Sequence, residues 1–177
     1  MNKLSLDATE DIDKFQGDGK IYFNLGIHGA LAPTAPTIMA CDFGIVNGSL
    51  TEPSRHLKVS DINLKGNYNN EGGAEKEFLS LEQIKFKTAG GPFNAKLLIK
   101  SFLNPQIDGT AAGTIDLSIA HAIFRFPYVE KLDGKVKVKA DFSMRTDPKQ
   151  SDLVFNTCDG NVQMRNVWCK LKEDKRT

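Results

Sequence analysis

Apolar and polar residues alternate along much of this 177-residue chain. The clearest run begins after Gly134, where lysine, aspartate and serine side chains separate successive apolar residues, which are Val136, Val138, Ala140, Phe142 and Met144. Successive side chains of a β-strand point to opposite faces of its sheet, so this period of two predicts a strand with one apolar face.

The same alternation recurs in other parts of the chain. It is present over residues 21–28 and 93–100, and shorter runs occupy 57–59, 62–64, 84–86, 107–117 and 162–168. Turn-forming residues separate many of these runs, at Asn47-Gly48, 69–73, 89–92, Asn104-Pro105, Asp108-Gly109 and Asp159-Gly160. Strands that follow one another at short spacing predict an antiparallel meander.

Helical periodicity is scarce. Ser118 is expected to cap one short helix, in which Ile119, Ala122, Ile123 and Phe126 share a side and which Pro127 ends. A second turn or two of helix is expected over residues 9–15. The predicted fold is therefore all-β with one or two short helices.

A sheet with one apolar face must have that face covered. Two helices are too few, so the predicted sheet either closes on itself as a sandwich or roll, or curls into an open groove whose inner face meets apolar ligands. The alternation is the same in both cases. By length the chain, residues 1–177, is one domain or a piece of a longer one, and it is long enough to bury a core.

Composition excludes some classes of partner. The residues are 40% hydrophobic and 25% charged, and the formal net charge is +1, so no strong field attracts nucleic acid or an anionic membrane. No run of about 20 apolar residues exists to cross a bilayer, and residues 1–7 lack the apolar core of a secretory signal. Their absence concerns this chain alone and leaves open that a longer parent protein carries them.

The chemistry-bearing residues form no recognisable site. The three histidines are far apart, and no nucleophile, phosphate-binding or metal-ligand motif occurs, so we expect no enzymatic activity, cofactor or metal. Cys41, Cys158 and Cys169 lack ligand spacing, and we expect free, buried thiols. The lysines that alternate over residues 135–139 are expected to face water and to discourage strand aggregation.

Several short motifs follow one another in the chain. They are Val59-Ser60-Asp61-Ile62-Asn63-Leu64-Lys65-Gly66, Leu81-Glu82-Gln83-Ile84-Lys85-Phe86, Gly91-Pro92-Phe93, Lys96-Leu97, Phe102, Asn104-Pro105, Ile107, Gly109, Gly113, Ile115-Asp116-Leu117, Pro127 and Leu132-Asp133-Gly134, and later Asp159-Gly160-Asn161-Val162 with Asn166-Val167. In their order and spacing these motifs resemble the C-terminal region of the AsmA family, and the coverage is best over residues 57–144.

This resemblance implies a fold, a place and a function. AsmA-like proteins, which are related to TamB and the bridge-like lipid-transfer proteins, are anchored in the inner membrane by an N-terminal helix and extend into the periplasm. Their curved β-groove is thought to carry phospholipid chains between inner and outer membranes and to support outer-membrane assembly. The chain lacks the anchor and the long body, so the resemblance implies a fragment of a longer envelope protein.

The expected function is therefore non-enzymatic binding of phospholipid acyl chains on an apolar inner face. The residues expected to line that face are Phe86, Phe93, Leu97, Ile99, Ile115, Leu117, Val136, Val138 and Phe142. Ordinary core packing is the alternative role for each of them. The alternative function is a closed β-sandwich that contacts other envelope proteins and binds no lipid.

Overall fold

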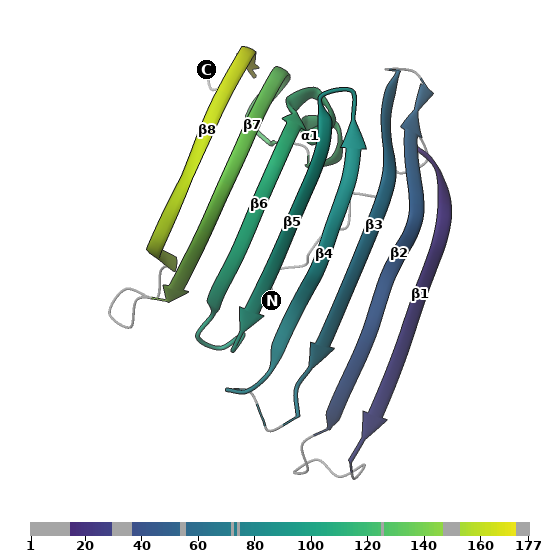
Figure 1. Ribbon diagram of the computed structural model, residues 1–177, viewed down its shortest axis with the longest axis vertical. Coiled ribbons are helices and arrows are strands. Elements are labelled where there is room, and N and C mark those ends of the chain that lie inside the picture. Colours follow the sequence, from purple (N-terminus) through teal and green to yellow (C-terminus); the bar gives the residue numbers. More distant parts are fainter. Residues whose placement is uncertain are drawn as a thin grey trace, which may run out of the picture.

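The fold is one eight-stranded antiparallel sheet with a single short helix among the described residues (Figure 1). The computed structural model describes residues 15–29, 37–53, 56–71, 73, 75–124, 126–146 and 153–172. The helix predicted over residues 9–15 lies almost entirely outside them.

The strands pair in the order of the sequence. They are β1 (Gln16–His28), β2 (Ile38–Glu52), β3 (Leu57–Asn69), β4 (Phe78–Thr88), β5 (Gly91–Lys100), β6 (Gln106–Asp116), β7 (Val129–Thr146) and β8 (Leu153–Leu171), and helix α1 (Leu117–Phe124) stands between β6 and β7. Every neighbouring pair is antiparallel, which confirms the predicted meander.

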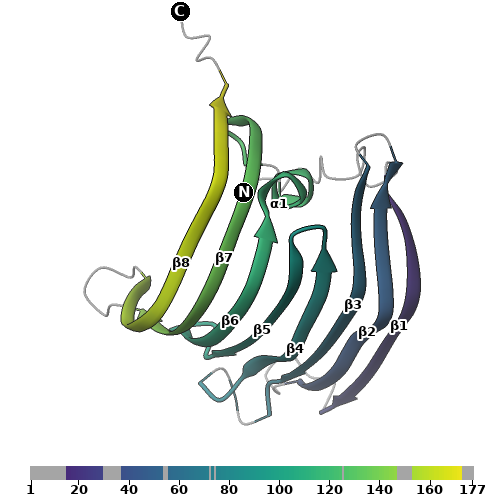
Figure 2. The ribbon, with the colours of Figure 1, turned by 45° about the horizontal axis from the view of Figure 1, so that its top comes forward.

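The sheet is open. Its two edges, β1 and β8, do not pair with each other, and no second sheet faces it in the described part of the chain. Figure 2 shows that the sheet is curved and that α1 lies on its concave side. Of the two predicted arrangements, the open curved sheet is confirmed and the closed sandwich is wrong.

Several predicted turns are instead parts of strands. Asn47-Gly48 lies inside β2, where the register shifts and Asn47 has a φ of 52°. Asn-Gly tolerates positive φ in a bulge as well as in a hairpin turn, so the dipeptide alone does not separate the two. Asp108-Gly109 and Asp159-Gly160 lie within β6 and β8.

Two other predicted turns are confirmed. Ala89-Gly90 joins β4 to β5, and Thr88 Oγ1 accepts a hydrogen bond of 3.1 Å from the Gly90 amide. Asn104-Pro105 lies between β5 and β6, where the Pro105 carbonyl accepts a 3.0 Å bond from the Thr146 amide.

Candidate functional site: the apolar face of the sheet

The strand register builds one continuous apolar face. Directly opposite residues of antiparallel strands share a face, so the register can be followed from strand to strand. Three rows cross all eight strands: Leu25, Cys41, Tyr68, Leu79, Ile99, Ile107, Met144 and Phe155; Phe23, Phe43, Gly66, Leu81, Leu97, Gly109, Phe142 and Cys158; and Ile21, Ile45, Leu64, Ile84, Ala95, Ala111, Ala140 and Gly160. We call the surface formed by these rows the apolar face.

Eight of the nine residues predicted for an inner face lie on this side of the sheet. Phe86 pairs with Phe93, and its ring stacks on that of Phe93 with centroids 4.8 Å apart. The others are Leu97, Ile99, Ile115, Val136, Val138 and Phe142, in β5, β6 and β7. The structure brings these residues together from four consecutive strands.

Leu117 is the exception, because it is not a strand residue. β6 ends at Asp116, and Leu117 is the first residue of α1. Asp116 Oδ1 accepts hydrogen bonds from the Ser118 amide at 3.1 Å and the Ile119 amide at 3.4 Å, so Asp116 caps the helix. The predictions that Ser118 is the cap and that Phe126 belongs to the helix are wrong.

Two glycines on the apolar face make room for aromatic rings. A Cβ at Gly109 would collide with the ring of Phe142, which is directly opposite in β7, and a Cβ at Gly66 would collide with the ring of Phe43. The rings therefore lie across the neighbouring strands and cover their backbone. This close approach explains why Asp108-Gly109 continues the strand where a turn is expected from sequence.

The apolar face has little cover. Among the described residues only Cys41, Val59, Phe93 and Ile119 are buried apolar side chains, and most of the face is partly exposed. Exposure rises toward the edges: Phe93 is 9% exposed, whereas Phe23 in β1 is 64% and Phe155 in β8 is 63% exposed. Monomeric proteins rarely leave a contiguous apolar surface of this extent open to water.

Helix α1 covers one end of the face. Ile119, Ala120, Ile123 and Phe124 of the helix face Val59, Phe86 and Ile115 of the sheet across an apolar cavity of about 210 Å³. The cavity shows that the helix lies over the sheet without filling the space beneath it.

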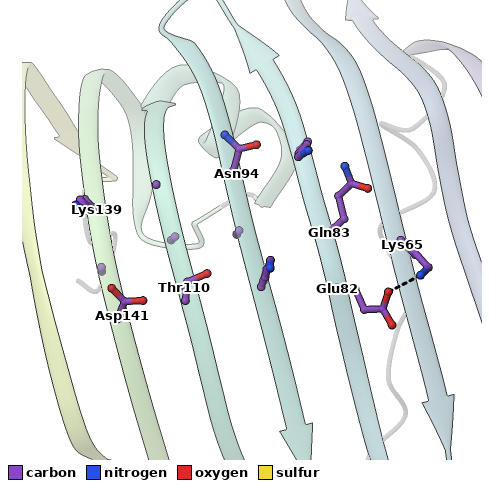
Figure 3. A pocket seen from close by; sticks show the side chains of 13 residues that line it. Lys65, Glu82, Gln83, Asn94, Thr110, Lys139 and Asp141 are labelled. Atoms are coloured by element: carbon purple, nitrogen blue, oxygen red, sulfur yellow. Dashed lines mark ion pairs between the residues drawn. The ribbon is translucent and has the colours of Figure 1, made fainter.

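The opposite face of the sheet is polar. A depression of about 620 Å³ lies on this face. Figure 3 shows acidic, basic and amide side chains of its lining, which come from β3, β4, β5 and β7. Lys65 forms an ion pair of 2.5 Å with Glu82, and this hydrogen bond and charge raise the pKa of Lys65. Because the charges are mixed, the depression carries no strong field of one sign.

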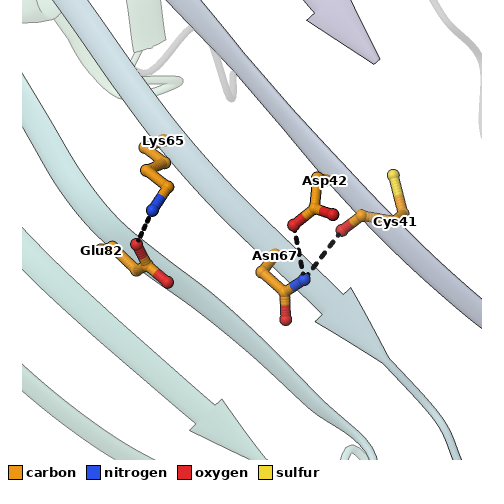
Figure 4. Close-up of polar contacts among 5 residues, drawn as sticks. All are labelled: Cys41, Asp42, Lys65, Asn67 and Glu82. Carbon is orange, nitrogen blue, oxygen red and sulfur yellow. Dashed lines mark hydrogen bonds and ion pairs between the residues drawn. The ribbon is translucent and has the colours of Figure 1, made fainter. Parts of the chain in front are cut away.

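Cross-strand hydrogen bonds on the polar face join β2 to β3. Asn67 Nδ2 donates to Asp42 Oδ1 at 2.8 Å and to the Cys41 carbonyl at 3.4 Å (Figure 4). Lys135, Lys137 and Lys139 are exposed, as predicted. Solvated polar groups therefore occupy one side of the sheet and apolar groups the other.

The chemistry of the other described residues is limited. They contain no cluster of three histidine, cysteine, aspartate or glutamate side chains placed to hold a metal ion. The three cysteines are free, as predicted, but only Cys41 is buried, whereas Cys158 and Cys169 are exposed on β8. None of the described helical segments has the length and apolar character needed to span a membrane.

The sequence prediction missed the outer parts of the apolar face. The β1 alternation was recognisable, but its residues were not assigned to the inner face; in β2, Cys41, Phe43 and Ile45 also alternate with Asp42 and Gly44. Because Asn47-Gly48 is expected from sequence to form a turn, the pattern does not reveal β2 as one continuous strand. Extending the period-two pattern through glycine and cysteine would have found these residues.

Comparison of the chain with protein-family models, with curated proteins and with solved structures found no match.

Proposed function

We propose that this chain is a non-enzymatic lipid-binding module, in which the apolar face receives phospholipid acyl chains. The observation that carries the proposal is the set of three rows that cross all eight strands with only apolar, aromatic or glycine residues. A surface of this kind requires an apolar occupant, and it offers the occupant no charged group in those rows.

The energetics suit an acyl chain. Burying a methylene group is worth about 0.8 kcal/mol, so a chain of about 16 carbons gains roughly 12 kcal/mol before the costs of ordering it. The contact is non-directional, so no hydrogen-bonding or catalytic side chain is needed. The small residues Ala95, Ala111 and Ala140, adjacent in the third row, leave room above the middle of the sheet.

The resemblance to the AsmA family supports a more specific role. As part of a longer, inner-membrane-anchored envelope protein, the module would lie in the periplasm, conduct phospholipids between the inner and outer membranes and so support outer-membrane assembly. Its open curved sheet has the shape that this role requires, and other envelope proteins are expected partners.

Adjacent leucines offer a matched test. Leu97 lies on the apolar face, opposite Leu81 and Gly109, whereas Leu98 lies on the polar face, opposite Ser80 and Asp108, and both are half-buried. We expect Leu97→Gln to weaken binding of a fluorescent acyl-chain probe about tenfold or more, because an amide without a hydrogen-bond partner would then face the acyl chain. Leu98→Gln should leave binding unchanged.

Mass spectrometry of lipids that co-purify with the chain completes the test. Phospholipid at near-stoichiometric level is expected. A protein free of lipid that binds no probe, or equal losses in the two leucine variants, would overturn the proposal and favour a face covered by another protein.

A further inference from the structure

The free edge of β8 is interrupted only toward its two ends, where the register of its pairing with β7 shifts, and the middle of the strand is regular. β8 pairs with β7 on one side and has no partner on the other among the described residues. It has 19 residues and contains no proline, and its exposed apolar side chains include Met164 at 69%. Natural edge strands are normally short, charged or interrupted, because an open edge is a template for another strand.

Two charged residues of β8 lie opposite residues of like charge in β7. Asp159 lies directly opposite Asp141, and Arg165 lies directly opposite Lys135. Like charges directly opposite each other destabilise a strand pair. Lys170, by contrast, forms a 2.6 Å ion pair with Glu130. Within the described part of the chain, Asp159 and Arg165 therefore each face a β7 residue of like charge.

We propose that two copies of this chain pair through β8, antiparallel and centred on Val162. Val162 is the middle residue of Leu153–Leu171, so this register places the regular residues 159–165 of the two copies opposite each other. Asp159 precedes Val162 by three residues and Arg165 follows it by three. In this register each Asp159 lies opposite Arg165 of the other copy, so the dimer forms two ion pairs beside the four like-charged pairs that its two copies contain.

The same register keeps the faces of the two sheets aligned. Directly opposite residues share a face, so Gly160 lies opposite Met164 of the other copy on the apolar side, and the charged pairs lie on the polar side. The pairing of β8 with β7 is regular from Thr157 to Arg165, the segment that contains both charges. The dimer has one continuous sheet of sixteen strands from the eight of each copy.

The other edge does not offer this complementarity. The charges of β1, Asp18 and Lys20, lie near one end of the strand, and pairing two copies about Gly19 would align only residues 16–22. Charge and strand length therefore favour β8 as the edge between copies.

Charge reversal tests the interface without threatening the fold. Arg165→Asp gives Lys135 an opposite charge within the chain, and Asp159→Arg does the same for Asp141, so both variants should fold. Across the dimer each reversal creates two repulsive pairs. By sedimentation equilibrium of lipid-free protein, we expect the wild type to dimerise and each reversal to weaken dimerisation by about tenfold or more.

Mixing the two variants restores complementarity. An equimolar mixture of Arg165→Asp and Asp159→Arg should form heterodimers, because every charged pair across the edge is again of opposite sign. Lys96→Asp, on the polar face of β5, changes the net charge by the same amount as Arg165→Asp and should leave the wild-type dimer intact.

A cysteine pair tests the register. In a background of Cys158→Ser and Cys169→Ser, Val162→Cys should give an intermolecular disulfide, whereas Thr157→Cys should not, because the two copies of residue 157 are then roughly 33 Å apart along the strand. A monomeric wild type, reversals without effect, or equal cross-linking at 157 and 162 would each overturn the proposal. Lipid binding is measured separately, so a lipid-binding monomer refutes only the dimer.

Discussion

The part of the apolar face beneath α1 and the part near the edge strands differ in cover, although the same alternation produces both. In this part, Val59 and Phe93 of the sheet and Ile119 of the helix itself are buried, as in an ordinary core. In β1 and β8, side chains with the same pattern are largely exposed, with Ile21 at 80%. The comparison shows that alternation determines which face of the sheet a side chain lies on. Whether that side chain is buried in a core depends on what covers the face.

The largest expected effect separates two phenylalanines on the same face. Phe93→Ala removes a buried ring that stacks on Phe86, so it should lower the free energy of unfolding by about 3 kcal/mol. Phe155→Ala removes a ring that is 63% exposed and should change stability little. Urea unfolding of both variants measures the contrast, and similar losses would show that the two regions are equally well packed.

A smaller effect on stability is expected at α1, the helix that covers one end of the apolar face. Asp116→Ala removes the cap of α1 and should destabilise the protein by about 1 kcal/mol. Asp116→Asn should be nearly neutral, because asparagine caps helices as well as aspartate does. Equal unfolding free energies for the alanine and asparagine variants would contradict the capping role.

The smallest effect is at the opposite end of the face, at Tyr68. Burial, followed by the charge of Glu77 and a 3.4 Å hydrogen bond that the phenol donates to Glu77, raises the pKa of Tyr68 above its ordinary value of 10.0. The folded state thus favours the neutral phenol. This stability is present below the pKa of the unfolded phenol and is lost as pH rises through the raised pKa of the folded state.

Tyr68→Phe should therefore lose less stability than the wild type when the pH is raised above about 10, the pKa of an unperturbed tyrosine. Unfolding free energies of the two proteins, measured at neutral and alkaline pH, test this difference. Parallel pH profiles would show that Tyr68 does not contribute to alkaline unfolding.

The strands and their faces were predictable because strand side chains alternate by geometry alone. The run from Gly134 to Met144 lies within β7, and eight of the nine predicted inner-face residues share one side of the sheet. Glycine was the main source of error. A glycine can allow a turn, a bulge or the close approach of a ring, and these uses look alike in a sequence, as Gly48 and Gly109 show.

By itself, the sequence determined that the chain forms an antiparallel meander of two-sided strands, because the period of two is a local property of each strand. Only the tertiary structure decided that the sheet stays open, that Asp116 turns the chain into α1, and which apolar side chains are buried. These outcomes depend on register and curvature between strands far apart along the chain. No local pattern of residues carries that information.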